Sequence, residues 1–220
     1  MAPLREHAPV VTGSAADFIP PRPTLPKLRE AAQGCRCHLW MHATQTVFGE
    51  GSSSAEVMLV GEQPGEQEDR QGHPFVGPSG RLLDAALERA GIDRTQVYLT
   101  NSVKHFKFVV IERGRRLHKK PNAAEVRACK PWLQEEIRLL HPRVIVALGA
   151  TAAQTLLGNQ FRVTQQRGKP VSTELAEAVF ATVHPSAVLR ARDADRQQAE
   201  EEFYRDITKV AAYLKAGKAK

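Results

Sequence analysis

The sequence predicts an α/β domain of three layers, in which helices cover both faces of a central sheet of four parallel strands. Four short apolar segments rich in β-branched residues indicate the strands, and helical patterns alternate with them along the chain. The apolar segments lie at residues 56–60, 97–100, 144–148 and 179–183. Strands that are apolar along their whole length are typical of parallel sheets buried on both faces.

The helices are predicted from apolar residues at helical spacing between these strands. We expect them at residues 79–90, 123–140 and 151–157, with a last one near 196–214. The first is the most clearly delimited, because Pro78 precedes it and Gly91 follows it. Proline is favoured in the first turn of a helix and glycine just past its end.

A length of 220 residues suits one well-buried domain of ordinary size and is short for two. Residues 1–26 include a proline-rich stretch at 20–26 and show no apolar periodicity, so we expect a flexible, extended N-terminal arm. Residues 27–214 then form a single domain, and residues 215–220 form a frayed basic tail.

The chain carries 31 lysine and arginine residues against 24 aspartate and glutamate residues, a net charge of +7. Such an excess favours a polyanionic partner, since Lys and Arg gain affinity by releasing counterions from phosphates. No apolar run approaches the eighteen or so residues of a membrane span, and the N-terminus lacks the pattern of a secretory signal. We therefore expect a cytoplasmic monomer with no membrane partner.

Each predicted strand is followed at once by a small or polar motif. In an open parallel sheet the carboxyl ends of the strands lie on one edge, where ligands bind. We therefore expect Glu62, Asn101 and His184 to share one crevice, although they are far apart in the sequence. The four motifs are Gly61-Glu62-Gln63-Pro64-Gly65, Asn101-Ser102, Gly149-Ala150-Thr151 and His184-Pro185-Ser186.

The residue types at this edge allow glycoside chemistry on a base. Glu62 could stabilise an oxocarbenium-like sugar or position a nucleophile, or it could be a solvated turn carboxylate. The amide of Asn101 offers a donor and an acceptor, which suits a base edge, although a turn or cap is also typical of such an asparagine. The glycine-rich turn lacks the Lys-Ser/Thr ending of a P-loop, which argues against an NTPase.

Two further side chains have both a functional and a structural interpretation. His184 could donate to a carbonyl oxygen, or it could cap a helix or fill the core. Phe75, in the motif His73-Pro74-Phe75-Val76-Gly77, could stack on an unstacked base or belong to the core.

The most basic segment of the chain is residues 113–120. It could be a solvated charge run, or a loop in which Arg115, Arg116 and Lys119 grip phosphates. In the second interpretation His118 would be the one titratable nucleophile among these cations. Neighbouring positive charge lowers the pKa of a histidine, which keeps the imidazole neutral and able to attack.

Three cysteines, Cys35, Cys37 and Cys129, and the histidine His105 form a possible ligand set. An odd number of cysteines in a reducing compartment argues against a disulfide framework. The four residues could be three buried cysteines and an ordinary histidine, or they could bind Zn²⁺ or an iron–sulfur cluster. Their spacing alone does not decide between these possibilities.

Several motifs resemble those of the family 4 uracil-DNA glycosylases, in order and in context, from about Cys35 to the last helix. They are Gly61-Glu62-Gln63-Pro64-Gly65, His73-Pro74-Phe75-Val76-Gly77, Asn101-Ser102-Val103-Lys104-His105-Phe106-Lys107-Phe108 and His184-Pro185-Ser186. The resemblance implies the α/β fold of uracil-DNA glycosylases and uracil-containing DNA, single-stranded or duplex, as the partner.

Within that family the chain resembles the UdgX branch, whose members crosslink themselves to DNA. Gln63 follows the glutamate of the catalytic loop, and a basic insertion ending in a histidine precedes Cys129. The insertion reads Lys-Arg-Arg-Ile-His in that branch and Gly114-Arg115-Arg116-Leu117-His118 here. The leading lysine is therefore a glycine, and the change from isoleucine to leucine conserves volume.

The resemblance assigns a role to each site residue. Phe75 would stack on a flipped uracil and Asn101 would read its polar edge, with Gly61, Gly65 and Ser186 completing the base pocket. Glu62 would stabilise the positive sugar, Gln63 would orient that loop, and His184 would hydrogen-bond the departing base. His118 would then capture C1′ of the sugar without turnover.

The resemblance also implies a [4Fe–4S] cluster held by Cys35, Cys37, His105 and Cys129. The family normally places two residues between the first two cysteines, and this chain has only Arg36 between them.

Two alternative functions remain open at this point. One is a conventional iron–sulfur uracil-DNA glycosylase that turns over, in which His118 is only a loop residue. The other is a non-catalytic nucleic-acid-binding module with a structural metal.

Overall fold

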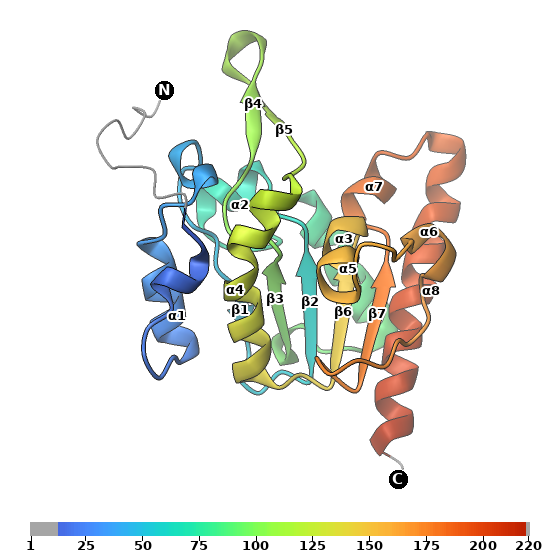
Figure 1. The fold of residues 1–220 in the computed structure, drawn as a ribbon. Helices are drawn as coiled ribbons and strands as arrows, with labels where there is room; N and C mark the ends of the chain where they lie inside the picture. The colour runs from blue at the N-terminus through green and yellow to red at the C-terminus, as the bar shows by residue number, and fades with distance from the viewer. Residues whose placement is uncertain (1–12, 219–220) are drawn as a thin grey trace.

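The computed structural model describes residues 13–218. A five-stranded sheet in the order β1-β3-β2-β6-β7 forms its centre (Figure 1). Four of its strands are parallel, as the sequence predicted, and their bounds agree with the predicted ones to within one residue. The fifth is a short edge strand that pairs antiparallel with β3. The strands are β1 (Glu50–Gly51), β2 (Val57–Gly61), β3 (Val97–Asn101), β6 (Val144–Leu148) and β7 (Ala178–Thr182).

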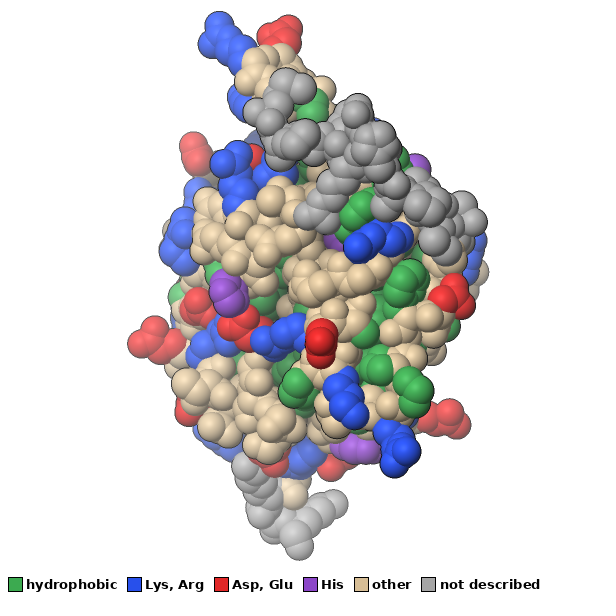
Figure 2. All heavy atoms as spheres, turned by 90° about the vertical axis from the view of Figure 1, so that its left-hand side faces the viewer, with side chains coloured by type: hydrophobic (Ala, Val, Ile, Leu, Met, Phe, Trp, Pro, Cys, Tyr) green, Lys and Arg blue, Asp and Glu red, His purple; other side chains and the backbone are tan. Residues whose placement is uncertain are grey.

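A separate two-stranded hairpin, β4 (Phe108–Val110) and β5 (Arg116–His118), stands above the carboxyl edge of this sheet (Figure 1). A short 3-10 turn, η4 (Glu112–Gly114), closes it, and Arg113 and Gly114 there have φ values of 60° and 73°. The basic segment predicted as a loop is thus an antiparallel hairpin. Figure 2 shows it as the projection at the top of the molecule, with basic side chains beside apolar ones.

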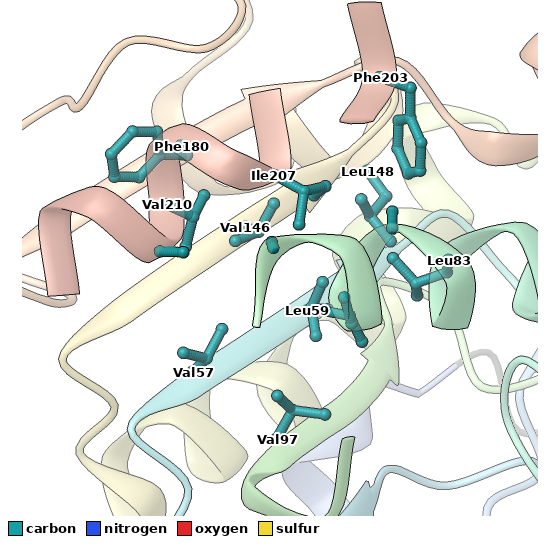
Figure 3. Close-up of a cluster of buried hydrophobic side chains, with 14 of the residues drawn as sticks. Val57, Leu59, Leu83, Val97, Val146, Leu148, Phe180, Phe203, Ile207 and Val210 are labelled. Carbon is teal, nitrogen blue, oxygen red and sulfur yellow. The ribbon is translucent and has the colours of Figure 1, made fainter. Parts of the chain in front are cut away.

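One face of the sheet packs against α3 (Pro78–Ala90), α7 (Pro185–Leu189) and α8 (Asp193–Lys218). Odd-numbered residues of β2 and β3 and even-numbered residues of β6 and β7 point to this face. Figure 3 shows side chains such as Leu59 and Val146 meeting Leu83 and Ile207. These side chains form one continuous apolar core. Burying a side chain of this size stabilises a fold by about 1.5–3 kcal/mol.

The other face packs against α4 (Ala123–Leu140), α5 (Ala150–Leu157) and α6 (Val163–Gln166). It uses the even-numbered residues of β2 and β3 and the odd-numbered residues of β6 and β7. Helix α4 begins at a capping box, in which Asn122 and Glu125 bond each other's backbone N–H. Both faces are covered, so the three-layer α/β architecture predicted from the sequence is confirmed.

The N-terminal segment forms a third cluster against α4. It contains η1 (Ala15–Phe18), α1 (Leu25–Gln33) and η2 (His38–Met41). The predicted arm is therefore wrong for its described part, because Ala15 is buried and packs on α4, while residues 1–12 lie outside the described residues.

The motif following β2 continues into α2 (Glu66–Gln71), and η3 (Arg94–Gln96) leads into β3.

Helix α8 continues through Lys218, so the first residues of the predicted frayed tail are helical. Residues 219 and 220 lie outside the described residues. No helix in the described range 13–218 is both long and apolar enough to cross a membrane.

Candidate active site

A cavity of about 250 Å³ opens at the carboxyl edge of the parallel strands. The motifs that follow β2, β3, β6 and β7 all contribute to its wall, as expected for an open parallel sheet. The structure therefore brings Glu62, Asn101 and His184 into one crevice. The other lining residues are Gln63, Pro64, Gly65, Glu68, Phe75, Ser79, His118, Lys120, Leu148, Gly149, Ala150, Thr151, Ser186 and Arg190.

Glu62 presents one carboxylate oxygen to each side of the cavity. Its Oε2 accepts a hydrogen bond from the hydroxyl of Thr151, in the first turn of α5. Its Oε1 lies 3.6 Å from Nε2 of His118. The carboxylate is thus oriented by Thr151 and faces the imidazole, while 19% of its side chain stays exposed.

The side chain of Gln63 is bonded to the base of the hairpin. Its Nε2 donates to the carbonyls of Lys107 and Lys119 at 3.2 and 3.1 Å, and its Oε1 accepts from the N–H of Lys107. We predicted that Gln63 orients the loop of Glu62. In the structure this one amide ties the Glu62 loop to the segment that carries His118.

Asn101 and Phe75 meet at Gly61. A Cβ atom at position 61 would lie 2.2 Å from Oδ1 of Asn101 and 2.9 Å from Cζ of Phe75. Glycine is therefore required at this position for the amide and the ring to approach. Gly61 itself does not line the cavity, and its carbonyl accepts from the N–H and hydroxyl of Ser102.

Phe75 has a strained backbone with φ of 58°, which is rare for a bulky residue. The turn is accommodated by Gly80, where a Cβ atom would lie 1.6 Å from the carbonyl oxygen of Phe75. The ring lies nearly parallel to that of His184, with 6.4 Å between centroids and 26° between planes. Both rings line the same cavity, although Phe75 is also part of the core.

His184 is both a helix cap and a cavity residue. Its Nδ1 accepts from the backbone N–H of Ser186 at 3.1 Å and is 2.8 Å from the hydroxyl of Ser186. The proton of the neutral imidazole is therefore on Nε2. Burial, together with the charges of Arg190 and His118, lowers the pKa of His184 to about 4. The ring is a neutral donor at neutral pH.

His118 is the last residue of β5 and pairs with Phe108 of β4. Burial lowers the pKa of its imidazole, and Arg190 acts in the same direction, while Glu62 opposes both. The sequence suggested that cations within its own segment lower this pKa. In the structure burial is the largest cause, and the nearby cation is Arg190 of α7's C-terminus.

Arg116 anchors the hairpin to α2. Its Nη1 lies 2.6 Å from Oδ2 of Asp69, and its guanidinium lies over the rings of Phe106 and Phe108. Only 14% of the side chain is exposed. We predicted that Arg116 binds a DNA phosphate, and this does not agree with a guanidinium already committed to Asp69. Arg115 and Lys119, by contrast, are exposed.

Among the lining residues that sequence reasoning did not identify as functional, four either carry a charge or bond to Glu62. Thr151 lies in a motif placed at this edge, so its position was predictable but its bond to Glu62 was not. Glu68 accepts from the N–H of Gly77 and fixes the loop that carries Phe75. Arg190 and Lys120 bring positive charge to the cavity. Arg190 could have been suspected from its place six residues after His184.

The sequence model of the uracil DNA glycosylase superfamily matches residues 48–208. A type-4 uracil-DNA glycosylase of Sulfurisphaera tokodaii is 38% identical over 175 residues, covering 76% of each chain. One of Thermotoga maritima is 37% identical over 180 residues, covering 81% of this chain and 88% of the relative. The chain belongs to the type-4 uracil-DNA glycosylases.

A solved structure of another protein supports the fold. The SMUG2 protein of Pedobacter heparinus superposes with a TM-score of 0.51 at 17% identity, covering 76% of this chain and 77% of that one. Every lining residue of the cavity lies within the matched range 48–208 of this type-4 chain. Cys35 and Cys37 precede that range, whereas His105 and Cys129 lie inside it.

The predicted metal ligands of this type-4 chain lie together beside α4. The thiols of Cys35 and Cys37 share a hydrogen bond, and Sγ of Cys37 lies 3.4 Å from Nδ1 of His105. Cys129 belongs to the same buried cluster and accepts from the N–H of Lys104. Among residues 13–218 no three or more His, Cys, Asp or Glu side chains are placed so that they could hold a metal ion together. The donor set, three buried thiols and one imidazole, nonetheless fits an iron–sulfur cluster in kind and number.

Proposed function

We propose that this type-4 uracil-DNA glycosylase releases uracil from DNA and that His118 captures C1′ of the sugar. The observation that carries the proposal is the pair formed by His118 and Glu62, whose Nε2 and Oε1 atoms lie 3.6 Å apart across the cavity. A glycosylase needs a carboxylate beside the sugar, and a crosslinking one also needs a nucleophile on the same side.

The base would be recognised by two side chains of the cavity wall. A uracil flipped from the helix stacks on Phe75, whose strained backbone fixes the ring at the cavity wall. The amide of Asn101 reads the polar edge of the base. Lys104 holds the Asn101 backbone, because its Nζ donates to the Asn101 carbonyl at 2.8 Å.

Cleavage of the bond between N1 and C1′ puts negative charge on the base and positive charge on the sugar. His184 stabilises the first, because its Nε2–H is the free donor and the ring stays neutral. The carboxylate of Glu62 stabilises the second. The two charges are thus stabilised by groups that follow two different strands of the sheet, β7 and β2.

Capture follows at C1′. The bond to N1 has broken by then, and its electron pair has left with the uracil. A lone pair of the neutral His118 imidazole forms the new bond to the positive C1′. The resulting imidazolium loses its remaining ring proton to solvent, and uracil is protonated. The lowered pKa of His118 keeps the attacking form populated at neutral pH.

The second candidate is hydrolysis with turnover. It is favoured by the exposure of the Glu62 carboxylate, which lets water reach the same position. Denaturing gel electrophoresis with a uracil-containing oligonucleotide separates the two. A heat-stable shifted band demonstrates capture by the protein. A free abasic product that accumulates beyond one equivalent demonstrates turnover and contradicts capture.

The group of Cys35, Cys37, His105 and Cys129 would hold the [4Fe–4S] cluster of this proposal. Such a cluster supplies a crosslink between chain segments. Here it would join residues 35–37 to α4 and to the loop that follows β3. In that loop His105 lies three residues before the hairpin begins at Phe108. None of the four residues lines the cavity.

A further inference from the structure

The hairpin β4–β5 carries an unusual concentration of exposed apolar surface. Val109, Val110 and Leu117 are 42%, 66% and 52% exposed. In the described part of the chain they are the only large hydrophobic side chains that are exposed. Val109 and Leu117 lie directly opposite each other across the two strands. Exposed apolar groups gathered at one place indicate a contact surface. Val110 pairs with Arg116 and lies on the other face of the two strands. We call these three residues, which expose apolar surface on both faces of the hairpin, the apolar hairpin surface.

Cations surround the apolar hairpin surface. Arg113, Arg115, Lys119 and Lys120 are all exposed, and within residues 13–218 none of them forms an ion pair. Glu112 is the single acidic residue between β4 and Lys120. This combination of unpaired positive charge with apolar surface fits a partner that carries phosphates and flat apolar groups, which describes an unpaired DNA strand.

The hairpin is held firmly at its base. Arg116 bonds Asp69, and the Gln63 amide bonds the backbone of both flanking segments at Lys107 and Lys119. The base therefore does not need DNA in order to form. The tip instead extends beyond the sheet edge, as Figures 1 and 2 show.

The apolar hairpin surface adjoins the cavity through the chain itself. His118 ends β5 and lines the cavity, and Lys120 lines it two residues later. A DNA strand that places one nucleotide in the cavity must therefore pass beside the hairpin. The bases next to a flipped nucleotide have lost a stacking partner, and their faces are apolar. In a duplex the same bases remain paired and stacked.

We propose that Val109, Val110 and Leu117 contact the unpaired bases that flank the flipped uracil. This contact makes the protein prefer single-stranded over duplex uracil-containing DNA. The inference rests on the proposed function for the position of the DNA, and it adds a contact to bases that are not themselves cleaved.

The test uses single-stranded oligonucleotides that differ only in their flanking bases. Both contain one 2′-fluoro-2′-deoxyuridine, because the electron-withdrawing fluorine disfavours a positive sugar and keeps the glycosidic bond intact. In the second oligonucleotide the three nucleotides on each side are abasic, so every phosphate remains. Fluorescence anisotropy gives the dissociation constant of the full chain for each.

We expect the parent protein to bind the strand with abasic flanks about tenfold more weakly than the normal strand. The triple variant Val109→Ser/Val110→Ser/Leu117→Ser should bind the two strands almost equally and lose the preference for single-stranded over duplex DNA. Arg115→Ala is the matched control in the same hairpin. It should keep the tenfold ratio and reduce the slope of log affinity against log salt by about one.

A ratio near one for the parent, or an unchanged ratio in the triple variant, overturns the inference. The inference is also overturned if the triple variant changes only the self-association measured by sedimentation. The surface would then be a contact between two copies of the chain. Thermal melting confirms that the variants fold. Uracil release from an unmodified oligonucleotide is measured separately. If the ratio holds but no uracil is released, the proposed function fails and the base contact stands.

Discussion

Lys104 and Glu136 form an ion pair that is completely shielded from solvent. Nζ of Lys104 lies 2.6 Å from Oε2 of Glu136, and neither side chain has any exposed area. Lys104 also donates to the hydroxyl of Thr100 and to the carbonyl of Asn101, and Tyr98 donates to Glu136. The pair thus ties the end of β3, which carries Asn101, to the middle of α4.

Removing one member of this pair should be strongly destabilising. Glu136→Ala leaves the Lys104 ammonium buried without a counter-charge, and we expect a loss of about 3–5 kcal/mol in the free energy of unfolding. Urea denaturation followed by far-UV circular dichroism measures it. The matched variant Lys104→Met/Glu136→Leu removes both charges and should be less destabilised than Glu136→Ala. If the double variant were the less stable of the two, the pair would be stabilising in itself.

His118→Ser should abolish the protein–DNA adduct while uracil release continues. The substitution removes the nucleophile and leaves Phe75, Asn101 and His184 in place. Denaturing gels score the adduct, and chromatography scores free uracil. His73→Ser is the matched control, because His73 is an exposed histidine paired with Glu50 outside the cavity. If the His118→Ser variant still crosslinks to DNA, another residue is the nucleophile.

Glu62→Gln should slow uracil release by roughly 100-fold or more. The amide is almost the same size and can still accept from Thr151, so the loss reports the negative charge that faces the sugar. Single-turnover kinetics with excess protein isolates this step from product release. Glu112→Gln, at the exposed tip of the hairpin, removes an equal charge away from the cavity and should have no such effect. A rate within a few-fold of the parent would reduce Glu62 to a turn residue.

The pH dependence of adduct formation should follow the protonation of His118. Because its pKa lies below the ordinary value, the neutral form predominates at pH 7, and the rate should be flat there and fall on the acid side. His184 adds a stability effect. Its pKa is about 4 when folded and near 6.5 when unfolded. Only the unfolded state takes up a proton between these values, so stability should be full above about pH 6.5 and decrease toward pH 4.

A His184→Asn variant checks the second half of that prediction. Thermal melting at pH 7 and at pH 5 gives the stability loss for each protein, and the loss should be smaller in the variant. If the parent and the variant lose equal stability between pH 7 and pH 5, groups other than His184 cause the loss of stability in acid.

The sequence was most informative where one local rule decides the structure. Runs such as Val144–Leu148, which are short, apolar at every position and rich in β-branched residues, are typical of a strand buried on both faces. Once the strands are parallel, their carboxyl ends share an edge. The meeting of Glu62, Asn101 and His184 therefore followed from the pattern, before any distance was known.

The sequence was least informative where long-range contacts decide. Residues 113–120 have the composition of a solvated loop, yet pairing with Phe108–Val110 makes them half of a hairpin. The local sequence does not indicate that Arg116 forms an ion pair with Asp69 of α2 while its neighbour Arg115 stays exposed. Strand alternation, which separates adjacent residues onto opposite faces, accounts for the difference only after the strand is known.

Purified protein should contain roughly four irons per chain and be brown, as a [4Fe–4S] cluster requires. Cys37 contacts His105, Cys35 contacts Cys37, and Cys129 lies in the same buried cluster. Burial raises the pKa of the Cys129 thiol to about 12, so a neutral thiol is expected there unless a metal displaces the proton. Metal analysis and the visible spectrum of anaerobically purified protein measure the iron.

The short spacing between Cys35 and Cys37 makes the variants of this prediction specific. If both thiols are ligands, Cys35→Ser and Cys37→Ser should each lose iron, as should Cys129→Ser. If Cys35→Ser retains the full iron content, the single residue Arg36 leaves Cys35 outside the ligand set. If the analysis finds zinc without iron, the site is a tetrahedral zinc site and not an iron–sulfur cluster. If it finds no metal, the three cysteines are buried free thiols. Binding of uracil-containing DNA should survive either result, because the cavity is built from strand ends and none of these four residues lines it.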